Sequence, residues 1–334
     1  MDIFDSNNRP LRTGFFLIDG FALMSYAAAV EPLRAANLLG GQNLFDVCNI
    51  SVGEASQSSG GAVIPADARI GESLELDVVL VVAGGDPMCF ENGRAFAWLR
   101  RLAQSGIALG GVSGGPAVLV RAGLMKGRRF TVHWEHAPIL AELYPDVLLD
   151  KALYVIDRDR ITCAGGTAPI DLMHYLIARR NGAEFARLVS DWFMHTDVRH
   201  AGGPQRSGLA ERYNVSNRAV VAAIEAMENH VADPLALSDL ARLSGVGMRQ
   251  LNRLFRKQLS TTTMRFYRHI RLEVARRLLV ASQVPITEIA IATGFADSAH
   301  LWKAHTEEFG MTPSAQREKG GNRQLESIAP PSTH

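Results

Sequence analysis

Short apolar runs alternate with helical periodicity through the first half of the chain, between residues 11 and 182. Four runs have the length and the β-branched or aromatic content of single strands: 12–18, 45–52, 77–85 and 107–112. Apolar residues recur at helical spacing in four other segments: 22–39, 95–103, a helix that starts at Pro116, and 168–180. A hairpin-like pattern occupies 152–166. Strands that alternate with helices indicate a parallel sheet with helices on both faces, so we predict an α/β fold for this half.

The last third of the chain carries a different pattern, in which two short helices flank a glycine turn. Residues 235–259 begin with a short helix whose apolar face we assign to Leu240, Ala241 and Leu243. Ser238 can cap this helix and Gly245 breaks it. A second helix opens near Met248, and its apolar stripe is Leu251, Leu254 and Phe255. This arrangement predicts a helix-turn-helix, which places its second helix in the major groove of DNA.

The same pattern returns about fifty residues later, at 284–310, with Gly294 in the place of Gly245 and Leu301 in that of Leu251. The segment MRFYRHIRLEVARRLL joins the two copies, and GFADSAHLWKAHTEEFGMTPSAQR closes the second. Together these segments resemble the DNA-binding domain of the AraC/XylS family of bacterial transcription regulators, over roughly residues 220–319. The resemblance implies an all-α domain whose two recognition helices enter successive major grooves of double-stranded DNA.

Basic residues are concentrated in the first copy and the helix after it. Residues 242–277 contain ten Lys or Arg and one acidic residue, although the whole chain has a net charge of only +1. A charge run can be a solvated helix face, but on a helix-turn-helix it indicates phosphate contacts. We predict DNA contacts from Arg249, Gln250, Arg253, Arg256, Lys257 and Arg271, and in the second copy from Ala299, His300, Trp302 and Lys303. Glu307 and Glu308 would repel phosphates, so we expect the second copy to be the weaker reader.

Composition places the chain among ordinary globular proteins, with 334 residues, 47% of them apolar and 21% charged. We expect no membrane span and no signal peptide, and therefore a cytoplasmic protein. The cysteines, Cys48, Cys89 and Cys163, lack metal-ligand spacing. We expect neither a metal site nor a cofactor.

Three strand ends of the α/β half carry candidate chemistry, because ligands of such sheets bind beyond the carboxyl ends of the strands. One strand ends in Gly84 and Gly85, whose backbone can expose amide N–H groups. Another ends in Ser113 and Gly114, on a sharp turn into a helix that starts with Pro. The segment RFTVHWEH supplies the remaining candidates: His133, Trp134, Glu135 and His136.

The segment Gly111-Val112-Ser113-Gly114-Gly115 matches G-x-S-x-G, the nucleophile elbow of hydrolases. A catalytic reading takes Ser113 as nucleophile, one of His133, His136 and His174 as base, and Asp146 or Asp171 as the group that orients the base. The other reading is a turn that only binds a ligand, which we favour because short motifs with loose positions arise often.

Four segments together resemble the PfpI-type, glutamine-amidotransferase-like domain at the front of GlxA-type AraC regulators: IDGFALMSYAAAVEPLRAAN, VVAGGD, GGVSGGPAVLVRAGLMKGRRFTVHW and TCAGGTAPIDLMHYLIAR. The resemblance implies a flavodoxin-like fold. In the enzymes of that superfamily a cysteine occupies the elbow, beside an acid from the first helix. Here the elbow residue is Ser113 and the acid matches Glu31, so the thiolate is missing. We therefore expect a ligand sensor and no enzyme. The alternatives are an amidase or acyl-transfer hydrolase, and a constitutive DNA-binding protein whose first domain only dimerises.

The predicted ligand site has both cation-binding and anion-binding groups. Backbone amides at Gly84, Gly85 and Gly114 favour a carboxylate, whereas Glu31, Glu135 and the face of Trp134 favour a cation; Ser113 and His133 complete the set. The regulators that the chain resembles are associated with catabolism of nitrogenous metabolites, which implies an amino acid or a betaine as effector. The resemblance further implies an activator that forms a homodimer and contacts RNA polymerase.

We divide the chain into four parts. Residues 12–198 form the ligand-sensing and dimerisation domain, and 199–215, rich in Gly and charge, form a linker. Residues 216–319 form the DNA-binding domain. We expect 320–334, which include Pro330-Pro331, to be a disordered tail.

Overall fold

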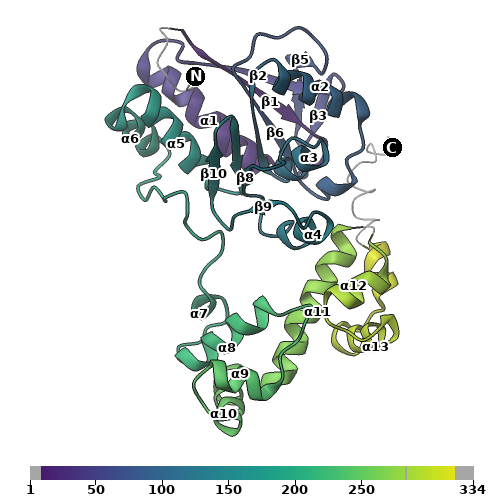
Figure 1. Cartoon of the computed structure of the whole chain (residues 1–334). Coiled ribbons are helices and arrows are strands. Elements are labelled where there is room, and N and C mark those ends of the chain that lie inside the picture. Colours follow the sequence, from purple (N-terminus) through teal and green to yellow (C-terminus); the bar gives the residue numbers. More distant parts are fainter. Residues whose placement is uncertain (1–8, 283, 320–334) are drawn as a thin grey trace, which may run out of the picture. The chain divides into compact units, whose positions relative to one another are not determined.

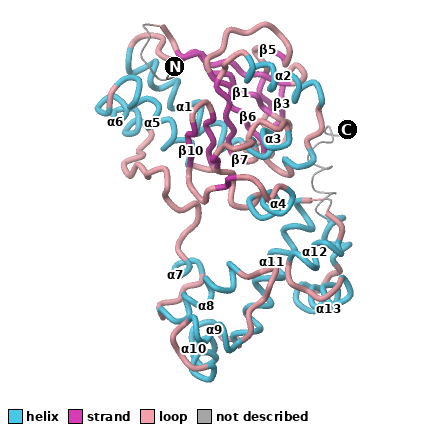
Figure 2. Tube along the Cα trace, in the orientation of Figure 1, coloured by secondary structure: helices cyan, strands magenta, loops and turns pink. Residues whose placement is uncertain are grey.

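The computed structural model describes residues 9–282 and 284–319 (Figures 1 and 2). The chain forms two compact units, and the division falls between Gln205 and Arg206. None of the helices in the described part has the length and hydropathy that crossing a bilayer requires.

The first unit is built on a seven-stranded sheet with the order β10-β11-β7-β6-β1-β2-β5. All neighbouring strands are parallel except the β10–β11 hairpin. The bounds are β1 (Leu11–Leu17), β2 (Phe45–Ser51), β5 (Ala68–Arg69), β6 (Val78–Ala83), β7 (Ala108–Ser113), β10 (Tyr154–Asp157) and β11 (Arg160–Cys163). The prediction of a parallel α/β sheet is therefore confirmed, and the hairpin-like segment forms the antiparallel pair β10–β11 at one edge of the sheet.

Helices cover both faces of this sheet, because successive residues of a buried strand point to opposite faces. Leu80 and Val82 of β6 belong to the core beneath α1 (Leu23–Gly40), α5 (Ala168–Asn181) and α6 (Ala183–Trp192). Val79 and Val81 belong to the opposite core, beneath α2 (Gly93–Gln104), α3 (Gly115–Arg121) and α4 (Ala137–Leu143). The carboxyl ends of β6 and β7 are thus held rigidly between two apolar layers.

Several short elements of the first unit were not predicted. These are β3 (Ala55–Gln57), β4 (Val63–Pro65), β5, β8 (Arg129–Phe130), β9 (Leu148–Leu149), a 3-10 turn η1 (Pro87–Cys89), α4 and α6. The strands have two or three residues each, too few to establish a period of two. Helix α6 was missed because it starts directly after α5, at Gly182, whose φ of 93° turns the chain between the helices.

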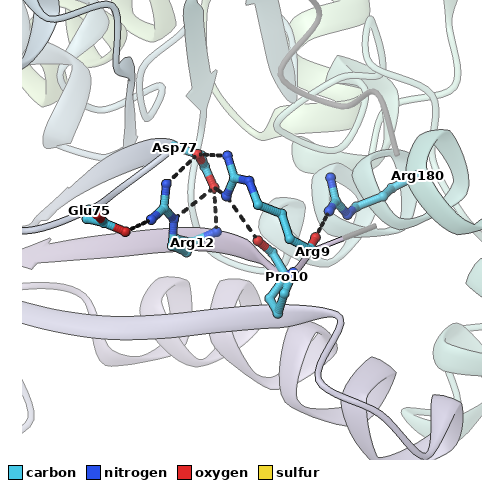
Figure 3. A network of polar contacts seen from close by, with 6 residues as sticks. All are labelled: Arg9, Pro10, Arg12, Glu75, Asp77 and Arg180. Carbon is cyan, nitrogen blue, oxygen red and sulfur yellow. Dashed lines mark hydrogen bonds and ion pairs between the residues drawn. The ribbon is translucent and has the colours of Figure 1, made fainter. Parts of the chain in front are cut away.

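A polar network ties the chain together where β1 and β6 begin (Figure 3). Asp77 accepts hydrogen bonds from both terminal nitrogens of Arg9, at 2.8 and 2.7 Å, and from the backbone N–H of Arg12 at 2.9 Å. Arg180, from the end of α5, donates to the carbonyl oxygen of Arg9. Burial opposes ionisation of Asp77, but the hydrogen bonds from Arg9 and Arg12 outweigh it and hold the pKa of Asp77 well below its usual range.

The second unit is all-helical. Its helices are α7 (Leu209–Arg212), α8 (Arg218–Asn229), α9 (Leu237–Leu243), α10 (Met248–Leu259), α11 (Thr263–Ala281), α12 (Ile286–Ala292) and α13 (Ser298–Phe309). The α9–α10 and α12–α13 pairs are the two predicted helix-turn-helix motifs, and α11 joins them. The glycines of both turns have positive φ, 68° at Gly245 and 71° at Gly294, which L-residues rarely adopt.

Two details of the first motif differ from the prediction. Helix α9 begins at Leu237 with Ala236 at the N-cap, so Ser238 lies inside the helix and does not cap it. Leu243 is exposed, because α9 buries Leu240 and Ala241 in the core and packs Leu237 partly against it. A seven-residue helix buries a single turn, so its last apolar residue is free to face outward.

The predicted linker, 199–215, is ordered against its neighbours at both ends. Arg199 contacts Asp171 of α5 through its backbone N–H and its guanidinium group, at 2.6 to 3.0 Å. The side-chain nitrogen of Gln205 donates to Thr131 Oγ1 and to two carbonyl oxygens of the first unit. Val215 is buried in the core of the second unit. The predicted tail, 320–334, lies outside the described residues.

Candidate functional site

Ser113 occupies a strained turn at the carboxyl end of β7. Its φ is 60°, in the left-handed region, and its side chain is buried, with the residue 5% exposed. The turn requires glycine at position 115, where a Cβ would overlap the carbonyl oxygen of Val81. The chain therefore adopts the strand–turn–helix geometry of a nucleophile elbow, as the sequence predicts.

A second loop, after β11, closes over this turn. A Cβ at Gly165 would lie 2.6 Å from the Cβ of Ser113 and 2.9 Å from Ser25 Oγ. Ser25 is buried in α1, and its hydroxyl accepts a hydrogen bond of 2.8 Å from the N–H of Gly166. Sequence reasoning missed Ser25, Gly165 and Gly166, although the two glycines follow a strand and could have been found by the rule that led to Gly84.

Glu31 does not take the place expected for it beside Ser113. Its carboxylate pairs with Arg34 of the same helix, at 2.7 Å, and is partly exposed. Ser25, which lines the elbow, precedes Glu31 by six residues, or about 9 Å along the helix at 1.5 Å per residue. The residue of α1 at the elbow is therefore a neutral serine.

The glycine amides differ in availability. The N–H of Gly114 donates to the carbonyl oxygen of Ala83, at 3.0 Å, so it is not free for a ligand. Gly84 packs against the Gly20–Ala22 turn, where a Cβ would lie 2.6 Å from the oxygen of Gly20. Within the described ranges, the N–H groups of Gly84 and Gly85 make no hydrogen bond to protein. These two amides remain as candidate ligand donors.

The segment after β8 lies against the elbow. The N–H of His133 donates to the carbonyl oxygen of Ser113, at 3.2 Å, and its ring lies 5.4 Å from that of Trp134. Burial lowers the pKa of His133, and the nearby carboxylate of Glu135 partly opposes this. Burial and the neighbouring His133 lower the pKa of His136 to about 4. Both imidazoles are therefore neutral near pH 7.

The residues considered for a catalytic relay lie in separate contacts. His174 Nδ1 is 2.8 Å from Ser190 Oγ, and Asp171 binds His195 and Arg199. Among the residues that the structure describes, no imidazole nitrogen lies within hydrogen-bond distance of Ser113 Oγ. The elbow geometry is present without an assembled triad.

Helix α10 presents the basic face predicted from the sequence. Its predicted DNA contacts are all exposed: Arg249, Gln250, Arg253, Arg256 and Lys257. Leu251 and Phe255 anchor the opposite face in the core. Within the described chain, none of these four cationic side chains takes part in an ion pair. The charges of α10 are therefore available to phosphates and base edges.

Helix α13 offers fewer such groups. Ala299, Trp302 and Lys303 are exposed, and the ring of His300 packs edge-on against Phe295 at 5.2 Å. The two acidic residues of this helix, which are expected to repel phosphates, both have partners within the protein. Glu308 Oε1 lies 2.8 Å from Nδ1 of His269 in α11, and Glu307 lies 3.7 Å from Arg268. Both carboxylates link α13 to α11.

Arg271 is used inside the protein and not on a free face, which corrects its assignment as a DNA contact. Its Nε donates to the carbonyl oxygen of Thr293, at 2.8 Å, and its Nη2 donates to that of Gly294. Its guanidinium lies 4.3 Å from the ring centroid of Phe295. The sequence could not distinguish an arginine that is hydrogen-bonded within the protein from an exposed one, because several basic residues occur along this helix.

Comparison with known proteins agrees with both units. Residues 12–179 match the DJ-1/PfpI family and residues 240–319 match a helix-turn-helix domain. The chain is 45% identical to the HTH-type transcriptional regulator GlxA of Rhizobium meliloti, over 95% of this chain and 98% of that regulator. It is 38% identical to the HTH-type transcriptional regulator CdhR of Pseudomonas aeruginosa, over 91% and 90% of the two chains. A THiJ/PfpI family protein from Pseudomonas syringae shares the fold, with a TM-score of 0.51, 20% identity, and coverage of 71% of this chain and 91% of that one. The chain therefore belongs to the GlxA-type AraC family of DNA-binding transcriptional regulators, which join a DJ-1/PfpI-type domain to a helix-turn-helix domain.

Proposed function

We infer that this regulator senses a small nitrogenous effector at the turn around Ser113 and adjusts transcription at promoters that α10 reads. The observation that carries this proposal is the strained, buried conformation of Ser113. A non-glycine residue in the left-handed region costs about 1 kcal/mol or more, and such strain is concentrated at functional sites. The loops after β6, β7 and β11 meet there, at the edge where ligands of parallel sheets bind.

The groups around Ser113 favour a zwitterion. The N–H groups of Gly84 and Gly85 suit a carboxylate, whereas Glu135 and the half-buried face of Trp134 suit an ammonium or quaternary nitrogen. The neutral hydroxyls of Ser113 and Ser25 add hydrogen-bonding groups without charge. An amino acid or a betaine combines both charges in a small molecule, and Glu31 and Gly114 are left out of this revised site.

Thermal unfolding of the full chain with a panel of amino acids and betaines tests the proposal. A ligand that binds only the native state increases the free energy of unfolding by RT ln(1 + [L]/Kd), and this raises the melting temperature. We expect Glu135→Gln to remove most of that shift. Glu72→Gln, at the far edge of the sheet, is the matched control and should retain it. Equal shifts for wild type and Glu135→Gln would contradict the site.

A second candidate function rests on the same turn. G-x-S-x-G in elbow geometry is the arrangement that presents a serine nucleophile, so amide or ester hydrolysis by Ser113 remains the enzymatic alternative. Turnover of amides or p-nitrophenyl esters that Ser113→Ala abolishes would establish it. Under the sensor proposal, Ser113→Ala weakens effector binding only by the loss of one neutral hydrogen bond, about 0.5–1.5 kcal/mol, and no turnover is measured.

On the DNA side, we expect a homodimer that activates transcription through contact with RNA polymerase. Support comes from the basic face of α10 and from the two helix-turn-helix motifs, which suit repeated sites on one face of DNA. A promoter fusion in cells that lack and carry the gene tests the direction of regulation. If reporter output is higher in cells that lack the gene, the protein is a repressor and not an activator.

A further inference from the structure

Helix α6 presents an apolar stripe to solvent. Figure 1 shows α6 beside α5, on one face of the sheet. Its inner side, Ala186, Val189 and Ser190, is buried, but Leu188 is 57% exposed and Trp192 is 50% exposed. Met194, just after the helix, is 85% exposed. Leu188 and Trp192 are four residues apart and so lie one above the other on the same face. Adjoining large apolar side chains of this kind indicate a surface that another molecule covers.

Two opposite charges flank the stripe on one side. Arg187 and Asp191 are both exposed and stand one helical turn apart. Their order, with the cation nearer the N-terminus, is the less favourable one for a pair within a helix. Neither side chain forms a hydrogen bond or ion pair with any residue in the described part of the chain. Both charges are therefore available to a partner.

A second copy of α6 has the complementary pattern. When a two-fold axis relates two antiparallel helices, the same flank of each helix meets the other. With the axis level with residue 189, Arg187 of one copy faces Asp191 of the partner subunit, and Asp191 faces the partner subunit's Arg187. A single position of the axis therefore forms two symmetry-related ion pairs, which use both charged residues of each copy. Leu188 and Trp192 lie beside these two ion pairs, where the partner helix excludes water from them.

We propose that α6 is a self-association surface, on which two copies of this chain pack as antiparallel helices around Leu188 and Trp192. This inference rests on the homodimer of the proposed function and identifies α6 as its interface. One helix face is smaller than the roughly 800 Å² per partner of a standard interface, so the dimer is weak in free solution. DNA that carries two sites strengthens it, because the second contact is then intramolecular.

Charge reversal in the full chain tests the surface by analytical ultracentrifugation. Arg187→Asp places acidic residues opposite each other, and Asp191→Arg places basic residues opposite each other. Each single variant weakens dimerisation by at least about tenfold. An equimolar mixture of the two variants restores it, because every facing pair then has opposite charges. Damage to the fold of α6 would not be repaired by mixing. Arg94→Asp, an exposed arginine of α2, is the control and leaves association unchanged.

The outcomes separate this inference from the proposed function. Single reversals that associate like wild type, or a mixture that stays monomeric, overturn the α6 surface. A wild-type chain that is monomeric at every concentration, with and without two-site DNA, also overturns it. A chain that dimerises through α6 but binds no promoter DNA would leave the surface standing and remove the proposed function.

Discussion

Arg271 of α11 stacks on Phe295, with its guanidinium carbon 4.3 Å from the ring centroid. The same guanidinium donates to the carbonyl oxygens of Thr293 and Gly294, at the turn of the second helix-turn-helix. This partly buried cation donates to two carbonyl groups and stacks on an aromatic face, so it holds that turn against the connecting helix. The basic residue nearest the middle of α11 is therefore structural.

We expect Arg271→Lys to destabilise the second motif by about 2–3 kcal/mol, because one ammonium cannot reproduce the two-pronged hydrogen bonds. Hydrogen exchange in α12 and α13 of the full chain measures the loss directly. Arg249→Ala, an exposed change on α10, should leave that exchange unaltered. Normal exchange in Arg271→Lys, combined with weaker DNA binding, would return Arg271 to the DNA surface.

Sequence periodicity was sufficient for the elements with long, regular patterns. The run Val78–Ala83 is buried along its whole length, and both faces of β6 are apolar, so strand and parallel sheet follow from one segment. The two helix-turn-helix motifs follow from glycines at matching positions. Elements of two or three residues, such as β8, are set by long-range pairing with β9 and carry no local signal.

The candidate site was predicted less well, because it depends on side-chain partners. The sequence places Ser113 on its turn through the glycines that the turn requires. It cannot show that Glu31 forms an ion pair with Arg34 or that the N–H of Gly114 donates to the carbonyl oxygen of Ala83. Nor can it show that Ser25 lies beside the loop that packs on Ser113. Each of these depends on which helix face packs on the sheet, and α1 is apolar over most of its circumference.

The acidic residues of α13 should differ in their effects on stability. Glu307 is half-exposed and 3.7 Å from Arg268, which is a weak surface pair. Glu308 is less exposed and hydrogen-bonds His269 at 2.8 Å. We expect Glu307→Lys to tighten DNA binding on specific and random DNA alike, with little change in stability. Glu308→Lys should instead lower the free energy of unfolding by about 1–2 kcal/mol, because the variant loses the hydrogen bond between the Glu308 carboxylate and His269.

Chemical denaturation together with electrophoretic shift assays separates the two effects. Glu307→Gln and Glu308→Gln are the matched neutral variants. Equal stability for Glu307→Lys and Glu308→Lys would show that the contact between α13 and α11 does not depend on Glu308.

His136 should make the first unit sensitive to mild acid. Burial, with the neighbouring His133, lowers the pKa of His136 from its usual 6.5 to about 4. Because the unfolded chain binds the proton at a higher pH than the folded chain, the free energy of unfolding is highest above pH 6.5. It falls as the pH drops from 6.5 to 4. The loss amounts to about 3 kcal/mol at 1.36 kcal/mol per pKa unit.

Urea unfolding of the full chain at pH 7.5, 6 and 5, followed by tryptophan fluorescence, measures this dependence. His136→Gln, which cannot gain the proton, should flatten the curve over this range. His200→Gln, at an exposed position, should keep the wild-type slope. A wild-type slope in His136→Gln would place the acid sensitivity in another group.

The two recognition helices should contribute unequally to sequence preference. Arg253 projects from α10 without an ion pair in the described chain, and a bidentate Arg–guanine contact discriminates by about 1–3 kcal/mol. Lys303 occupies the exposed face of α13, between residues that offer few hydrogen-bonding groups. A lysine contacts phosphate as a point charge, so its loss weakens binding without changing which sequence is bound.

We therefore expect Arg253→Ala to weaken binding to the promoter site more than Lys303→Ala does, and to narrow the gap between specific and random DNA. Lys303→Ala should weaken both alike and reduce the salt dependence by about one phosphate contact. Electrophoretic shift assays at two salt concentrations measure both quantities on the same protein. A larger loss of specificity in Lys303→Ala would assign base contacts to α13 and phosphate contacts to α10, because each variant removes one basic side chain from one of the two helices.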